Sequence, residues 1–133
     1  MRRSPIKRKS NRKKLLDSAY DAMRNYIRKT RGPNCELCGL ERGNMGLFHI
    51  LPRGKYPKIQ LLEENVLWAC WLPCHHNFHH DPFYAKEVVF PKITEIRGKG
   101  WEDSLKAQDK MAQSLSPSTI EMHKVYYEQK LGH

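Results

Sequence analysis

The chain has 133 residues, which is enough for one domain with a modest hydrophobic core. Its hydrophobic content of 39% and charged content of 29% are typical of a soluble globular protein, and no apolar run approaches the roughly 20 residues that span a bilayer. The sequence carries 24 Lys and Arg against 14 Asp and Glu, a formal net charge of +10. This excess favours a polyanionic partner, most simply nucleic acid, and no membrane partner is expected.

The beginning of the chain is a basic segment without apolar periodicity. Residues 1–14 contain eight Lys and Arg and no acidic residue. We interpret residues 1–10 as a disordered basic arm that lies along a phosphate backbone, with a plain solubilising tail as the alternative. The segment lacks the apolar stretch of a secretory signal, so we expect a cytoplasmic protein.

A helix is predicted over residues 11–30. Apolar side chains recur there at steps of three and four residues, from Leu15 to Ile27. Asn11 is the candidate N-cap, and the sequence Arg31-Gly32-Pro33 ends the helix. We expect the apolar face to cover the core, and the basic opposite face is a second candidate for contact with DNA.

The four cysteines occur as two closely spaced pairs, Cys35-x-x-Cys38 and Cys70-x-x-x-Cys74. Two thiolates on one tight turn can bind a single metal ion, and Gly39 permits the tight return of the first turn. One such pair alone is also typical of a thiol redox site. Because a second pair is present, we predict a structural zinc site made by all four cysteines in a reducing compartment.

Two short antiparallel strands are expected between the cysteine pairs, over residues 47–51 and 66–69. His49 lies between apolar neighbours in the first strand. Taken alone, it is most simply a buried histidine with satisfied hydrogen bonds.

A turn-rich basic loop follows the first strand. It contains Arg53, Lys55 and Lys58 together with one glycine and two prolines. These turn residues would hold the basic side chains outward, where they suit phosphate groups. A solvated loop without a ligand is the alternative.

Four histidines follow the second cysteine pair, on a helix that is expected to start near residue 75. His75 and His79 are four residues apart, and so are His76 and His80. Residues at this spacing share a helix face, so either pair could chelate one metal ion. The spacing alone leaves both pairings open.

The remainder of the chain, residues 82–131, is predicted to form structural helices. The first runs from Pro82 to about residue 89, capped by Asp81, and we expect Pro91 to interrupt or kink it. A second helix is expected over residues 102–114, and a third after the sequence Ser116-Pro117-Ser118. No heptad pattern persists in them, and a homodimer is left open.

The predicted inner faces of the last two helices follow from their apolar residues. For the second helix these are Leu105, Gln108, Met111, Ala112 and Leu115. For the third they are Ile120, Met122, Val125, Tyr126 and Leu131.

The order and spacing of these motifs resemble the zinc-knuckle branch of the HNH endonucleases, the His-Me finger or ββα-metal group. The pattern runs from Cys35-x-x-Cys38 through His49-Ile50 and Asn65-Val66 to Cys70-x-x-x-Cys74-His75-x-x-x-His79. It covers about residues 33–82. The segment 49–54 followed by Asn65-Val66 is also similar to small phage-type HNH proteins, including the NinG/Rap recombination nucleases.

The resemblance implies an α+β, mostly helical fold in a single domain, residues 11–133. A small ββα-metal core with a four-cysteine zinc site would span residues 33–82, flanked by the N-terminal helix and the C-terminal helices. It also implies a metal-dependent endonuclease acting on duplex or branched DNA and leaving 5′-phosphate and 3′-hydroxyl ends.

The resemblance assigns roles to individual residues. His49 would be the general base, and Asn65 would fix the loop that orients it. His75 and His79 would hold a catalytic divalent ion, Mg²⁺ or Mn²⁺, although two imidazoles also suit other transition metals. Arg53, Lys55 and Lys58 would contact DNA.

Two positions depart from the family pattern. Phe48 stands where many of these nucleases have an aspartate or histidine that binds metal. The second cysteine pair encloses three residues rather than two, with Pro73 in the turn. Phe48 supports an alternative function, a zinc-stabilised DNA-binding protein with an inactive HNH site.

Overall fold

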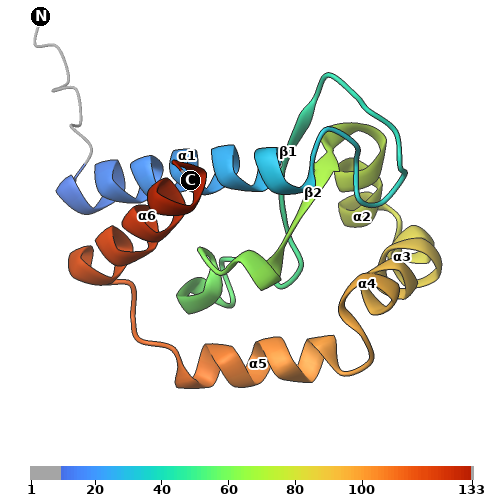
Figure 1. Cartoon of the computed structure of the whole chain (residues 1–133). Coiled ribbons are helices and arrows are strands. Elements are labelled where there is room, and N and C mark those ends of the chain that lie inside the picture. Colours follow the sequence, from blue (N-terminus) through green and yellow to red (C-terminus); the bar gives the residue numbers. More distant parts are fainter. Residues whose placement is uncertain (1–9, 133) are drawn as a thin grey trace, which may run out of the picture.

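The computed structural model describes residues 10–132. The predicted basic arm, apart from Ser10, lies outside the described residues. The described chain is α+β and mostly helical, with one two-stranded sheet, which confirms the expected fold class (Figure 1). Within that part of the chain, every helix is too short or too polar to cross a membrane.

The long first helix, α1 (Asn11–Arg31), confirms the strongest periodic pattern in the sequence. Its N-cap is Ser10 rather than Asn11, because the Ser10 hydroxyl accepts a hydrogen bond from the Lys13 amide at 3.2 Å. The last helix, α6 (Pro117–Leu131), packs along α1 (Figure 1). The helix α1 buries one face, made of Ala19, Tyr20, Ala22, Met23 and Ile27.

The sheet consists of β1 (Met45–His49) and β2 (Val66–Cys70), which pair antiparallel from Met45–Cys70 to His49–Val66. The predicted first strand, residues 47–51, is therefore wrong at both ends. It ends at His49 because the side chain of Asn65 binds the N–H and C=O of Leu51, in place of a strand neighbour.

The two faces of β2 contribute to two different hydrophobic clusters. Leu67 and Ala69 pack with the cysteines and the helices that follow them. Val66 and Trp68 pack with α1 and α6. Successive strand residues point to opposite faces, so this short buried strand links the two halves of the core.

The loop between the strands contains two 3₁₀ turns, η1 (Pro57–Ile59) and η2 (Glu63–Asn65). After β2, a π-helical turn, η3 (Trp71–His75), leads into the short helix α2 (His76–His80). The expected start of the histidine helix near residue 75 is thus confirmed.

The regular α-helix that begins at residue 82 is interrupted directly before Pro91, as predicted, but the helical path continues beyond it. That path runs through α3 (Pro82–Tyr84), the π-helical turn η4 (Ala85–Val89) and α4 (Phe90–Arg97). In a regular α-helix the ring of Pro91 would clash with the preceding turn and would leave a carbonyl without its donor. The wider π-helical turn directly before Pro91 relieves that conflict.

The helix α5 (Trp101–Met111) is shorter than predicted, and its inner face differs. Met111 is 87% exposed, so its expected place in the core is wrong. The backbone of Ala112 is extended, with ψ 149°, and ends the helical periodicity there. Leu105 and Leu115 are buried as expected, but Leu115 reaches the α1–α6 cluster from the loop.

The inner face of α6 was also predicted in part wrongly. Met122, Val125 and Tyr126 are 70%, 39% and 40% exposed, whereas Ile120 and Tyr127 are buried. Ile120 and Tyr127 are seven residues apart and share one stripe of the helix, while Met122 lies about 200° around the axis from Ile120. The residues predicted for the inner face of α6 therefore came from two different faces of that helix.

The hydroxyl of buried Tyr127 donates a hydrogen bond to the backbone carbonyl of Leu61, which joins α6 to the inter-strand loop. Replacing Tyr127 by Phe leaves that buried carbonyl without this donor, so we expect the free energy of unfolding to fall by about 1–2 kcal/mol. Tyr126→Phe is the matched control, because the Tyr126 hydroxyl bonds Glu63 at the exposed surface. Urea unfolding of both variants measures the difference, and equal losses would contradict this packing.

Candidate metal centre and active site

The four cysteines converge on one point. Their sulfur atoms all lie within 4.8 Å of one another, and none forms a disulfide. The Sγ atoms of Cys35 and Cys74 are 3.8 Å apart, and those of Cys38 and Cys70 are 3.9 Å apart. In a tetrahedral site with Zn–S bonds of ~2.3 Å, neighbouring sulfurs are about 3.8 Å apart. The cluster is therefore compatible with a structural metal such as zinc.

The local backbone favours thiolates at this cluster. Gly39 has φ +77°, which allows the sharp return after Cys38. The amides of Leu37, Cys38 and Cys70 all donate to Cys35 Sγ, at 3.3 to 3.4 Å. Such donors stabilise a charged sulfur, as in a metal-binding turn.

Electrostatics without an ion favour mixed protonation of the four thiols. Burial raises the pKa of the Cys70 and Cys74 thiols. Burial also acts to raise the pKa of Cys38, but hydrogen bonds from Arg42 and the Leu40 backbone outweigh it and lower that pKa to about 6. A cation among the sulfurs would supply the charge that keeps all four deprotonated.

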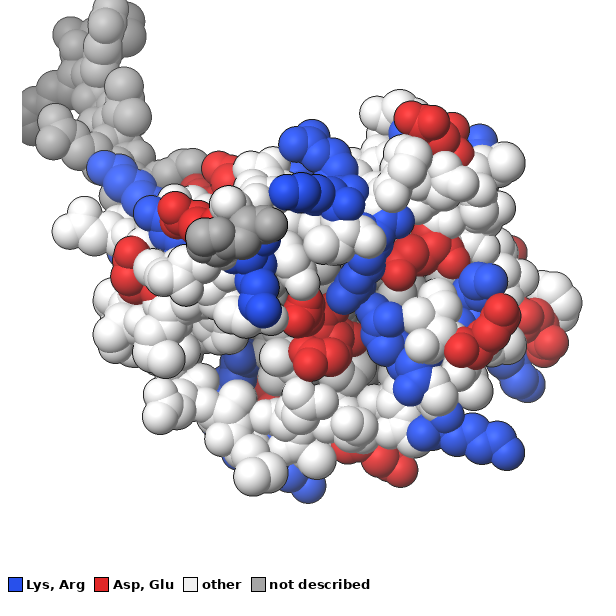
Figure 2. Space-filling view, viewed as in Figure 1, with Lys and Arg blue, Asp and Glu red and all other residues white. Residues whose placement is uncertain are grey.

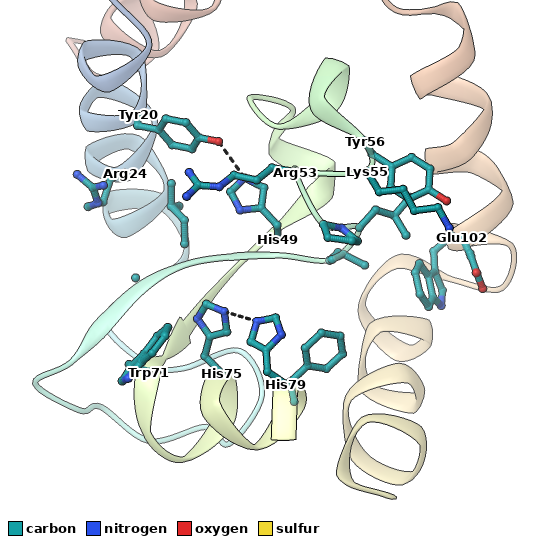
Figure 3. A pocket seen from close by; sticks show the side chains of 18 of the residues that line it. Tyr20, Arg24, His49, Arg53, Lys55, Tyr56, Trp71, His75, His79 and Glu102 are labelled. Carbon is teal, nitrogen blue, oxygen red and sulfur yellow. Dashed lines mark hydrogen bonds between the residues drawn. The ribbon is translucent and has the colours of Figure 1, made fainter. Parts of the chain in front are cut away.

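A groove of about 1030 Å³ lies between α1, β1, the basic loop, α2 and α5 (Figure 3). It brings together five of the predicted site residues: His49, Arg53, Lys55, His75 and His79. Lys58, His76 and His80 do not line it. Of the two histidine pairings, the structure thus groups His75 and His79 with His49.

His49, at the end of β1, is held in one orientation. Its Nε2 atom lies 2.9 Å from the backbone carbonyl of Gln60, and the Tyr20 hydroxyl is 3.4 Å away. Tyr20 in turn donates to Gln60 Oε1 at 2.8 Å. A carbonyl oxygen only accepts, so the proton of the neutral imidazole lies on Nε2. The Nδ1 lone pair, which has no partner among the described residues, is left to accept a proton.

Burial lowers the pKa of His49, and the positive charge of Arg53 lowers it further, against the opposing effect of the Gln60 carbonyl. The imidazole is therefore neutral near pH 7. The guanidinium of Arg53 also lies 5.8 Å from the centre of the Tyr20 ring.

Asn65 is fully buried and fixes the backbone at two points, just after His49 and just before Gln60. Its Oδ1 accepts from the Leu51 amide at 2.9 Å, and its Nδ2 donates to the carbonyls of Leu51 and Ile59 at 3.1 and 3.4 Å. Leu51 follows His49 closely, and Ile59 directly precedes Gln60. The asparagine therefore holds both the strand end that carries the imidazole and the carbonyl that orients it.

His75 and His79 present their Nε2 atoms to each other at 2.9 Å (Figure 3). Two nitrogens ~2.1 Å from one ion are about 3 Å apart at a right angle and about 3.4 Å apart at a tetrahedral angle. The spacing thus fits two adjacent ligands of a six-coordinate ion. Burial, then the charges of His79 and His49, lower the pKa of His75 to about 4, so its imidazole is neutral at pH 7 and free to act as a ligand.

Phe48 is a core residue and not a ligand. It is 1% exposed, and its ring packs against His75 and Phe78 with centroids 4.9 and 4.8 Å apart. The cysteine cluster is the only group of three or more possible metal ligands among the described residues. An ion on His75 and His79 would therefore draw its other ligands from water or substrate.

Three residues of the site were missed in the sequence. Tyr20 belongs to the apolar periodic pattern of α1. Nothing in the sequence indicated that its hydroxyl contacts His49. Gln60 acts through its backbone carbonyl, which no residue pattern reveals. Trp71 lies next to His75, with ring centroids 4.6 Å apart. Its position directly after a buried strand was the one sequence feature that could have indicated its place in the site.

Comparison of the chain with models of protein families, with curated proteins and with solved structures finds no match. The resemblance to HNH nucleases therefore depends on the motifs in the sequence alone.

We expect one zinc ion per chain in protein purified under reducing conditions, bound by the cysteine cluster. Cys35→Ser should lose most of the zinc and lower the melting temperature, because the binding free energy of a structural metal is also folding free energy. Elemental analysis measures the zinc content. The double variant His76→Ala/His80→Ala is the control and should keep its zinc; an unchanged zinc content in Cys35→Ser would contradict the assignment.

The pKa of His49 should be below its usual 6.5 in the folded protein, so the imidazole is neutral at pH 7 and becomes protonated only as the pH falls through this lower pKa. Arg53→Ala removes a repelling positive charge and should move the midpoint upward. Lys58→Ala, outside the groove, should not. NMR titration of the His49 ring measures all three, and a wild-type midpoint at or above 6.5 would contradict the described environment.

Proposed function

We propose that the protein is a metal-dependent DNA endonuclease. One observation carries the proposal: His49, oriented with Nδ1 free by Gln60 and Asn65, shares a groove with a pair of histidine nitrogens only 2.9 Å apart. A histidine base beside a two-histidine metal site is the minimum machinery for hydrolysing a phosphodiester.

The residues of the groove take separate parts in the proposed reaction. His49 Nδ1 accepts a proton from a water molecule, whose oxygen forms a bond to phosphorus while the bond from phosphorus to the 3′ oxygen breaks. The departing 3′ oxygen takes up a proton from solvent water and becomes the 3′-hydroxyl. The protonated imidazole keeps its Nε2–H bond to the Gln60 carbonyl. A divalent ion on His75 and His79, Mg²⁺ or Mn²⁺, would supply neutralising charge for the phosphate and the departing oxygen.

Positive side chains of the groove support DNA as the substrate. Arg53 and Lys55 lie within it, and neither has an ion-pair partner in the described part of the chain. On the face shown in Figure 2, Lys and Arg are mixed with Asp and Glu rather than gathered in one patch. The net charge of +10 therefore supports DNA binding in general. Arg53 and Lys55 support the groove as the place where the DNA binds.

A second function has one observation in its favour. Phe48 is buried at the position where the family carries a ligand, so residues 10–132 supply the proposed ion with two ligands only. This arrangement fits a zinc-stabilised DNA-binding protein whose HNH site is inactive.

A cleavage assay separates the two functions. Zinc-loaded protein should nick or cut supercoiled plasmid with Mg²⁺ or Mn²⁺, and His49→Ala should reduce the rate about 100-fold or more, since the proton acceptor is lost. His76→Ala is the matched control from the same helical region and should retain the wild-type rate. A four-way junction and a linear duplex of equal sequence, compared in the same assay, measure any preference for branched DNA.

Two results would count against the nuclease. Undiminished cleavage by His49→Ala would remove the assigned base. Salt-sensitive DNA binding by the wild type, with no cleavage under any divalent ion, would establish the DNA-binding alternative instead.

A further inference from the structure

We propose that the groove binds single-stranded DNA, with unpaired bases stacked on aromatic side chains beside the candidate active site. The inference rests on the proposed function, which makes DNA the bound polymer. It adds that the bound DNA is single-stranded. It depends on three features of the groove: exposed aromatic rings, cations without ion-pair partners, and limited size.

Aromatic rings lie at both ends of the groove. Trp71 is 53% exposed and lies beside His75 at one end, and Tyr56 lies at the other (Figure 3). Phe90, 39% exposed, stacks on Trp101 with ring planes 28° apart, and both also line the groove. Large rings left in contact with water beside polar groups are typical of binding surfaces.

The cations near these rings favour a polyanion. Arg24 is paired with Asp21 at 2.7 Å, and Lys106 is paired with Glu102 at 2.9 Å, so their charges are compensated within the protein. Arg53 and Lys55 have no such partner in the described part of the chain. Besides Asp21 and Glu102, the groove contains one more carboxylate, from Asp17. Unpaired cations next to exposed rings match a ligand that carries both phosphates and flat apolar groups.

Single-stranded DNA fits this combination better than duplex DNA. In a duplex the faces of the bases are covered by their neighbours, and only the base edges are accessible in the grooves. In a single strand each base can stack on an aromatic side chain while cations follow the backbone. The volume of about 1030 Å³ is also on the scale of a small-ligand pocket, which suits a few nucleotides.

Fluorescence anisotropy with a labelled thymidine 20-mer and a duplex of the same length tests the inference. The zinc-loaded protein is used without Mg²⁺ or Mn²⁺, so that binding is separated from cleavage. We expect the single strand to bind about 5-fold or more tightly than the duplex, and Trp71→Leu to weaken single-strand binding by about 5-fold or more. Trp71→Phe, which keeps a ring, should retain most of the affinity.

Phe83→Leu is the matched control, because Phe83 is 71% exposed but does not line the groove. It should bind as the wild type does. Equal affinities for the two DNA forms, or a Trp71→Leu variant no weaker than Phe83→Leu, would overturn the inference.

The plasmid assay keeps the two proposals distinguishable. Metal-dependent cleavage without a single-strand preference would remove the inference and leave the nuclease. A single-strand preference that depends on Trp71, without any cleavage, would uphold the inference and remove the nuclease.

Discussion

The convergence of four cysteine sulfurs is the constraint on which the rest of the structure depends. Cys35 and Cys38 follow α1, whereas Cys70 ends β2 and Cys74 lies in the turn before His75. A metal bound there would contribute about 10–16 kcal/mol in small zinc domains, which is comparable to the whole stability of a typical protein, roughly 5–15 kcal/mol. A sheet of two five-residue strands could not hold the histidine helix against β1 by itself. Since His75 directly follows Cys74, the same cluster sets the distance between the histidine helix and His49.

The hydrogen bonds of the Asn65 side chain are a second, smaller constraint, which acts on the part of the groove around His49. The side chain of Asn65 replaces the strand ladder at Leu51, and it also holds the backbone before Gln60. Both effects converge on the imidazole of His49 and fix its tautomer, while its burial lowers its pKa. A buried amide with three hydrogen bonds is well satisfied, so orienting the His49 imidazole costs the fold little. Structural stability and the proposed chemistry thus share the same few contacts.

Patterns within one element were readable from the sequence, and contacts between elements were not. The periodicity of α1 and the paired cysteine spacing predicted a helix and a cluster that the structure confirms. The end of β1 was missed because the side-chain amide of Asn65 replaces the strand hydrogen bonds at Leu51. An interruption near Pro91 was foreseen, but the π-helical turn that lets the helical path continue was not. On α6, the choice between Tyr126 and Tyr127 depended on which face meets α1. In the site, residue types predicted the histidines, but Tyr20, the Gln60 carbonyl and the rings around Trp71 become partners only through the fold.

Chemical rescue measures the central claim, that His49 is the base of a hydrolytic site, most directly. His49→Gly would leave a cavity in the groove where free imidazole can bind, while the zinc cluster and the His75–His79 pair stay intact. The account predicts that added imidazole raises the metal-dependent DNA cleavage rate of this variant and leaves that of the wild type unchanged. A glycine variant that cleaves as fast as the wild type without imidazole, or one that imidazole fails to activate although it still binds DNA and zinc, would contradict it.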